Sequence, residues 1–172
     1  MSAERGGNDV LLSEFAAALE AQGVRLAGLV QDNVECGGSD APCDMLTRVL
    51  PDGPIYQISQ SLGPEARGCR LDPEALEQAV GQVQSSLETG QPDLLIANKF
   101  GKHEAAGRGM RPLIADALSR DIPVIMGVNK LNLDAFQEFC DNDATLIEAA
   151  LDPLLNWFSG LGSARAQSRA AG

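Results

Sequence analysis

The sequence has 172 residues, the size of a single domain that can bury a substantial core. Its formal net charge of −11 excludes a general nucleic-acid-binding or anionic-membrane surface, because such partners would be repelled. No stretch approaches the roughly 18 consecutive apolar residues of a membrane span, and the first residues, MSAERGGNDV, lack the apolar core of a signal peptide. We therefore expect a cytoplasmic protein with no membrane partner.

Hydrophobic periodicity and turn residues predict helices that alternate with strands. The first half should contain a helix over 9–22, a strand over 24–30, a long excursion over 31–54, a strand over 55–59, and a helix over 72–89. The excursion has a short apolar stretch at 45–50, where a short strand or hairpin could form. The second half should contain strands over 94–97 and 123–128 and helices over 111–120, 134–140 and 144–158, the last interrupted near Pro153. Asp72 and Pro73 are typical of an N-cap and a first helical residue.

Buried strands that alternate with helices predict an α/β fold, namely a three-layer parallel sheet with helices on both faces. We expect one domain over residues 1–160 and a flexible C-terminal tail over 161–172, which is rich in Ala, Ser, Arg and Gly. In such folds, ligands bind beyond the carboxyl ends of the strands. The loops that follow Val30, Ser59, Ala97 and Val128 are therefore the places to look for a site.

The loop after residue 97 reads NKFGKHEAAGRGMR and is unusually basic for so acidic a chain. Its Lys99, Lys102, Arg108 and Arg111 are four of 13 basic residues, and it also carries the single histidine, His103. Its glycines, at positions 101, 107 and 109, would let backbone amides approach a ligand closely. We predict an oxyanion pocket here; the alternative is a solvated loop whose cations pair with neighbouring carboxylates.

Two other loops contribute further candidates. SQSLGPEARGCRL adds Arg67 and Arg70, which could supply guanidinium groups to the same anion or could simply be surface arginines of a helix-entry loop. Cys43 and Cys69 are a secondary candidate pair for a soft metal, although the four cysteines (Cys36, Cys43, Cys69 and Cys140) fit no zinc pattern and we expect free thiols.

The runs LPDGPIYQISQSLGPEARGCRLDPEALE and DLLIANKFGKHEAAGRGMRPLIADAL resemble a bacterial family of uncharacterised proteins described as nucleoside-triphosphatase-like. The resemblance implies a P-loop NTPase-like fold and an association with molybdenum uptake or nitrogen fixation, and it brings no established activity. Nearly the whole chain takes part in it.

The departures from a working triphosphatase are informative. The degenerate P-loop would be AERGGNDVLL, which contains Gly6, Gly7, Asn8 and Asp9; Asn8 and Asp9 stand where the P-loop pattern GxxxxGK[ST] has its lysine and hydroxyl residue. The acidic residue that should close a buried strand and anchor magnesium is replaced by Asn98 and Lys99. Too few residues precede this segment to form the strand that normally comes before a P-loop. We therefore expect either that the sheet lacks its first strand or that the true start of the chain lies upstream. An edge left open in that way would favour a homodimer.

Three functional hypotheses follow. The first is a protein that binds a small oxyanion or a nucleotide phosphate without ordinary hydrolysis, in molybdenum homeostasis. The second is a phosphohydrolase or phosphotransferase with an unorthodox site, in which His103 or Glu104 acts as acid or base. The third is a regulatory module whose basic loop docks an acidic protein. The sequence identifies neither a cofactor nor a catalytic residue.

Overall fold

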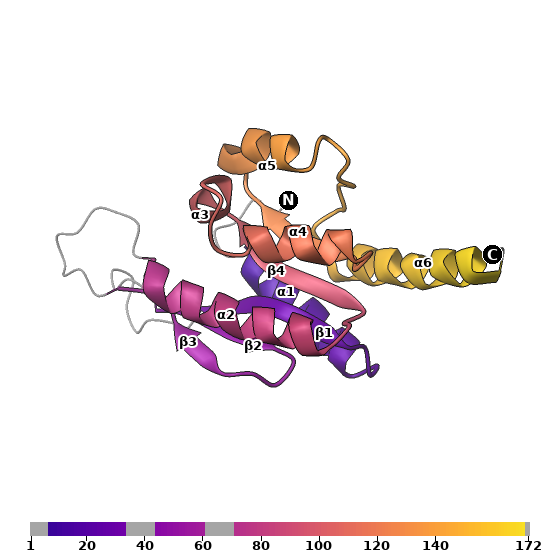
Figure 1. Cartoon of the computed structure of the whole chain (residues 1–172), viewed down its shortest axis with the longest axis horizontal. Coiled ribbons are helices and arrows are strands. Elements are labelled where there is room, and N and C mark those ends of the chain that lie inside the picture. Colours follow the sequence, from indigo (N-terminus) through magenta and orange to yellow (C-terminus); the bar gives the residue numbers. More distant parts are fainter. Residues whose placement is uncertain (1–6, 34–43, 61–70, 171–172) are drawn as a thin grey trace.

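A computed structural model describes residues 7–33, 44–60 and 71–170, with side chains described as far as residue 162. The elements, in chain order, are α1 (Gly7–Glu20), β1 (Leu26–Asn33), β2 (Met45–Leu50), β3 (Ile55–Gln57), α2 (Pro73–Thr89), β4 (Leu94–Phe100), α3 (Lys102–Ala105), α4 (Arg111–Ser119), β5 (Val124–Val128), the 3₁₀ helix η1 (Lys130–Asn132), α5 (Leu133–Phe139) and α6 (Leu151–Ala170). Figure 1 shows them around one sheet.

The sheet is mixed, which corrects the prediction of a parallel sheet. Its strand order is β3-β2-β1-β4-β5, with β1, β4 and β5 parallel and β2 and β3 antiparallel to their neighbours. The physical reason is connectivity: four residues, Pro51 to Pro54, join β2 to β3, and so short a connection permits only an antiparallel pair. The parallel part consists of the strands that alternate with helices.

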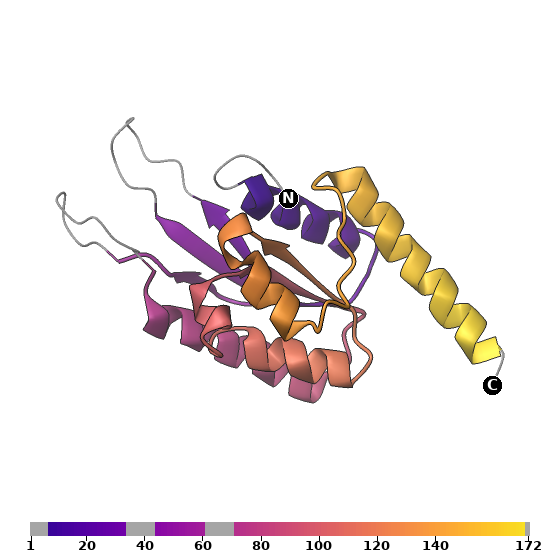
Figure 2. The same ribbon diagram turned by 90° about the horizontal axis from the view of Figure 1, so that it is seen from above.

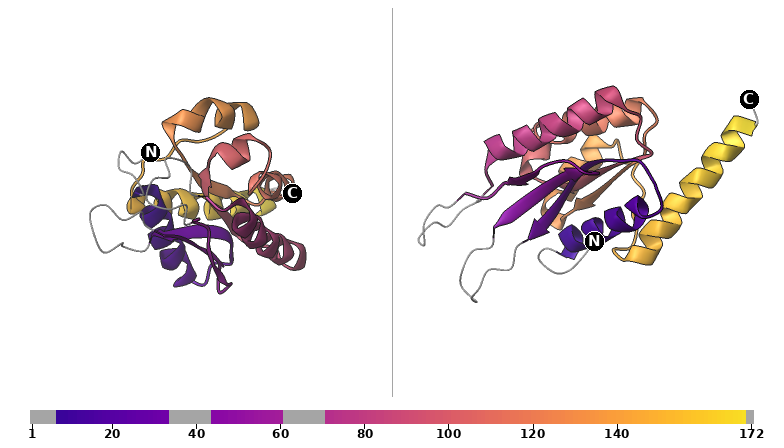
Figure 3. Two further views of the ribbon diagram at one scale, coloured as in Figure 1. Left: turned by 90° about the vertical axis from the view of Figure 1, so that its left-hand side faces the viewer. Right: turned by 90° about the horizontal axis from the view of Figure 1, so that it is seen from below.

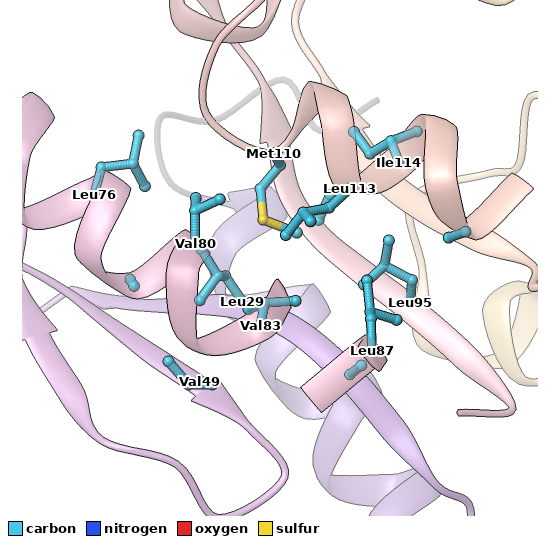
Figure 4. Close-up of a cluster of buried hydrophobic side chains, with 14 of the residues drawn as sticks. Leu29, Val49, Leu76, Val80, Val83, Leu87, Leu95, Met110, Leu113 and Ile114 are labelled. Carbon is cyan, nitrogen blue, oxygen red and sulfur yellow. The ribbon is translucent and has the colours of Figure 1, made fainter. Parts of the chain in front are cut away.

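Helices cover both faces of the sheet, as the sequence predicts. Figure 2 shows α1 and the start of α6 on one face and α2 with α4 on the other. Figure 4 shows the core between the sheet and α2 and α4, where Leu29 and Leu95 meet Val83 and Ile114. A second cluster joins the opposite face to α1 and α6, and a third, around Phe100, joins α5 to the carboxyl ends of β4 and β5.

Local sequence signals predict the start of α2 correctly but the start of α6 incorrectly. Asp72 caps α2 as predicted, because its carboxylate accepts hydrogen bonds from the backbone N–H groups of Glu74 (3.0 Å) and Ala75 (3.2 Å). The helix predicted over 144–158 is wrong in its first half: residues 143–150 are irregular and α6 begins at Leu151. Pro153 lies in the first turn of α6, where a missing N–H costs nothing, and so it marks the start of a helix rather than an interruption.

The long helix α6 extends well away from the body of the molecule (Figure 3). It includes residues 161–170, the stretch that the sequence assigns to a C-terminal tail. None of the helices in the described ranges combines the length and the apolar character needed to cross a lipid bilayer.

Candidate anion site and the buried network beside it

A buried polar network lies at the carboxyl ends of β1 and β4. Asp9, in the first turn of α1, accepts a hydrogen bond from Asn98 Nδ2 (2.8 Å) on one carboxylate oxygen and from Gln31 Nε2 (3.4 Å) on the other. Asn98 Oδ1 accepts the backbone N–H of Gln31 (3.2 Å). All three side chains are at least nine-tenths buried, so the network is part of the interior.

This network occupies the place that the sequence assigns to a degenerate P-loop. Asp9 puts its own carboxylate at the start of α1, where the helix dipole favours a negative charge. Asn98, at the position where the sequence leads us to expect a metal-binding acid, donates to Asp9. The side chain of Asn8 lies against Gly127 of β5, where an added Cβ would come within 3.2 Å of Asn8 Nδ2. Asp9, Asn98 and Gln31 are thus hydrogen-bonded to one another at the positions where the sequence predicts the loss of the standard phosphate and magnesium contacts.

The basic loop beyond β4 is organised by a buried carboxylate. Glu104, in α3, is 5% exposed; its Oε2 accepts the N–H of Gly101 (2.9 Å) and its Oε1 accepts the N–H of Met110 (3.3 Å). The N–H of Gly109 donates to Glu77 Oε1 (3.0 Å) on α2. Gly109 has φ +60°, a conformation that glycine adopts without strain.

The N–H groups of the loop's own glycines are engaged within the fold. The N–H groups of Gly101 and Gly109 are held by carboxylates, and that of Gly107 donates to the carbonyl oxygen of Glu104 (3.0 Å). The glycines serve the folding of the loop.

The cations of the loop fall into two groups. Lys99, Lys102 and Arg108 are exposed, and within the described part of the chain none of them forms an ion pair. Lys99 Nζ donates to Gln31 Oε1 (3.2 Å) and so connects the loop to the buried network.

Arg111 is different, because it is half-buried and stabilises the loop from within. Its guanidinium group lies 4.7 Å from the centroid of the Phe139 ring, and it donates to the carbonyl oxygens of Glu104 (3.3 Å) and Ala105 (3.4 Å). The structure therefore places Lys99, Lys102 and Arg108 on the loop surface and gives Arg111 a packing role.

His103 is half-buried, and its Nε2 atom is buried without a hydrogen-bond partner among the described atoms. A buried polar atom in this state costs free energy unless a water or a ligand satisfies it. The carboxylate of Glu104, by contrast, already holds two N–H groups, so it is poorly placed to act as an acid or base on a substrate.

Several of the predicted anion-binding, metal-binding and P-loop residues fall outside the part of the chain that the structure describes. Arg67, Arg70, Cys43, Cys69 and Gly6 lie outside the described residues. Within the described ranges, no three side chains of the His, Cys, Asp or Glu type come together as a metal site. Cys140 has a free thiol, and burial, assisted by the negative charge of Asp143, raises its pKa.

The predictions from the sequence do not include Gln31 and Glu77, which hydrogen-bond to Lys99 and to the N–H of Gly109 respectively. Gln31 directly follows the apolar run of β1 and would have been found by asking which polar residue ends that buried strand. Glu77 lies 32 positions from Gly109 along the chain, and no local pattern relates the two.

The fold and the edge of the sheet thus define an α/β domain whose carboxyl edge carries a buried polar network and a basic loop with exposed cations. A family model described as "Protein of unknown function (DUF2478)" matches residues 1–157, and the chain belongs to this family.

The chain is also 35% identical over 150 residues to the molybdenum import ATP-binding protein ModC 2 of Bradyrhizobium diazoefficiens. That match covers 87% of this chain and 16% of the longer protein. No solved structure matches.

Proposed function

We propose that this domain binds a small oxyanion or the phosphate groups of a nucleotide through its basic loop, without hydrolysing the ligand, and that its fold is a degenerate relative of the P-loop NTPases. The observation that carries the proposal is the arrangement of charge in the loop. Glu104 is turned inward onto backbone N–H groups, whereas Lys99, Lys102 and Arg108 remain exposed and free of ion pairs in the described structure.

The rigidity of the loop supports binding rather than mere solvation. The carboxylates of Glu104 and Glu77 hold three backbone N–H groups, and Arg111 is packed on Phe139. Charged side chains on a fixed backbone lose less conformational entropy when they bind a ligand than those on a floppy loop. The buried Nε2 atom of His103 adds a polar group that a nearby oxyanion or an ordered water could satisfy.

We propose that the ligand is not hydrolysed because of the residues that form the buried network. Phosphoryl transfer in P-loop NTPases uses a P-loop lysine and an acidic residue that holds magnesium. The corresponding positions are occupied by Asn8, Asp9 and Asn98, and Asp9 and Asn98 are already hydrogen-bonded to each other. A phosphate group at the start of α1 would be repelled by the carboxylate of Asp9.

The resemblance to ModC 2 narrows the candidate ligands to a nucleotide and molybdate. The name of that protein mentions both ATP binding and molybdenum import, but this chain matches only 16% of it. We propose a role in molybdenum homeostasis, in which the domain binds a tetrahedral oxyanion such as molybdate, with a nucleotide phosphate as the alternative ligand.

Isothermal titration calorimetry with molybdate, phosphate, sulfate and magnesium-free ATP tests the proposal. We expect saturable binding of at least one of them, weakened by added salt because the cations are exposed. Lys102→Ala together with Arg108→Ala should lower the affinity about tenfold or more, since each removes a charged hydrogen-bond donor.

The matched control for Arg108→Ala is Arg25→Ala. It removes the same charge from the opposite end of the sheet, where the exposed Arg25 is paired with Asp93 (2.7 Å). Equal losses in the two single variants would show a general field effect and contradict a site at the loop. Binding of no tested oxyanion would refute the proposed function.

A further inference from the structure

A groove runs along the outer edge of β5. Its volume is about 560 Å³, and it is lined by every residue from Pro123 to Val128. In the described sheet β5 is the last strand, so this groove follows the backbone edge at which a sheet can accept a further strand.

The irregular segment 143–149 also lines the groove and forms a second wall beside β5. The groove is therefore a slot rather than a flat surface. Neighbouring strands lie roughly 4.8 Å apart, so an extended chain beside β5 would be enclosed between the strand and this segment. The volume is within the range of about 300–1,000 Å³ that is typical of ligand sites and suits a strand of a few residues better than a globular surface.

The two sides of the slot are both apolar. Leu12 and Leu154 line it on the side of α1 and α6, and Ile114 and Phe136 line it on the side of α4 and α5. A strand in the slot would thus bury the side chains on both of its faces. Such strands are continuous apolar runs, in contrast to the alternating pattern of a strand with one wet face.

Charge at the rim further defines the occupant. Asp143 and Glu148 are exposed residues of the segment that forms the second wall, and both line the groove. None of the described residues that line it is basic. An apolar segment with basic residues at its ends is therefore the complementary partner.

We propose that this groove binds an extended, uninterrupted apolar segment of another polypeptide, flanked by basic residues, as an additional strand beside β5. Main-chain hydrogen bonds to the β5 edge would supply affinity, and the two apolar walls would select the sequence. A second copy of this chain fits less well, because its own β5 edge lies beside its own segment 143–149, and both segments would have to move before the two edges met.

The single tryptophan of the chain, Trp157, lines the groove and provides a direct probe. The experiment titrates the full chain with a peptide of five apolar residues (Val-Val-Ile-Val-Val) between pairs of lysines. Two control peptides of equal length and charge replace the second and fourth apolar residues with serine, or the central one with proline. We expect a saturable blue shift of Trp157 emission with the first peptide, and at least tenfold weaker binding of each control.

Amide hydrogen exchange locates the complex. The N–H groups of residues 123–128 should exchange at least tenfold more slowly when the apolar peptide is bound, whereas those of α2 should be unchanged. This readout needs no variant.

Charge reversal then tests the rim. Asp143→Lys with Glu148→Lys should weaken the lysine-flanked peptide about tenfold and strengthen a glutamate-flanked one; both sites are exposed, so the fold should tolerate the changes. Glu88→Lys, an exposed site on α2, is the control and should change neither affinity.

Three results would overturn the proposal: no saturable signal at millimolar peptide, equal binding of all three peptides, or a dimer whose β5 amides are already protected and become exposed on dilution. The last would assign the edge to a second copy. None of these results depends on whether the basic loop binds an anion.

Discussion

The two polar regions at the carboxyl edge of the sheet differ in where their charges are satisfied. In the buried network, the carboxylate of Asp9 meets the side-chain amides of Asn98 and Gln31. In the basic loop, the carboxylate of Glu104 meets backbone N–H groups, and the neighbouring cations are left exposed. The side chains of the first region are at least nine-tenths buried, whereas the second region presents exposed cations to a ligand. Position at the edge of an α/β sheet therefore does not by itself identify a binding site.

The largest expected effect comes from removing the carboxylate that organises the loop. Glu104→Ala leaves the N–H groups of Gly101, which is part-buried, and Met110, which is buried, without an acceptor, at a cost of about 3 kcal/mol in the free energy of unfolding. Urea denaturation measures the change, with the exposed Glu88→Ala as the control, expected to stay within about 0.5 kcal/mol. A loss below 1 kcal/mol would show that the loop does not depend on this residue.

Gly109→Ala should cost about 2 kcal/mol, for two reasons. The residue has φ +60°, and an added Cβ would clash with the carboxylate of Glu104. Gly107→Ala is the matched control, since Gly107 also has a positive φ but has open space around it. Thermal or urea denaturation should show a larger loss for Gly109→Ala; equal losses would remove the clash from the explanation.

Asp9→Asn tests the buried network at a smaller cost, about 1–2 kcal/mol, because the new amide would place N–H groups against the amides of Asn98 or Gln31. Because the substitution also removes a negative charge near the edge, oxyanion affinity should stay the same or rise slightly. Calorimetry on the folded variant decides this point. If the affinity falls tenfold while the fold is intact, the buried network belongs to the binding site and the contrast between the regions fails.

The smallest effect concerns Cys140, which lies outside both regions. Burial, together with Asp143, raises the pKa of its thiol, so at neutral pH the thiolate fraction is lower than in an unfolded chain. Alkylation by iodoacetamide, followed at the Cys140 peptide by mass spectrometry, should be several-fold slower in the folded chain than in urea and should accelerate at higher pH in the folded form. Equal rates in the two states would contradict the raised pKa.

The sequence predicts the elements of the fold that have local signals. The Asp72–Pro73 helix start, the apolar run of β4 and the helix at Arg111 all appear close to the predicted positions. The sequence does not show whether β2 and β3 pair in parallel or antiparallel. A short apolar stretch within a polar excursion does not specify which strands lie beside it. The prediction of an interruption near Pro153 is wrong, because a proline in the sequence can mark either the start of a helix or a break within one.

For the candidate site, the sequence predicts which residue types gather in the loop but not how their side chains are arranged. Clustering of basic residues is visible in the sequence, but the inward turn of Glu104 and the packing of Arg111 on Phe139 depend on residues that meet only in the folded chain. The same holds for the contact between Asp9 and Asn98, which are 89 positions apart. Long-range hydrogen bonds decide which of the predicted charges remain available.

The most direct test of the central claim is a two-dimensional ¹⁵N–¹H NMR titration of the labelled chain with molybdate, and separately with phosphate and magnesium-free ATP. The account predicts saturable shifts at the amides of Lys99 to Met110, with little change at Gly7 to Val10. Shifts concentrated at Gly7 to Val10, or no saturable shift with any of the three, would contradict it.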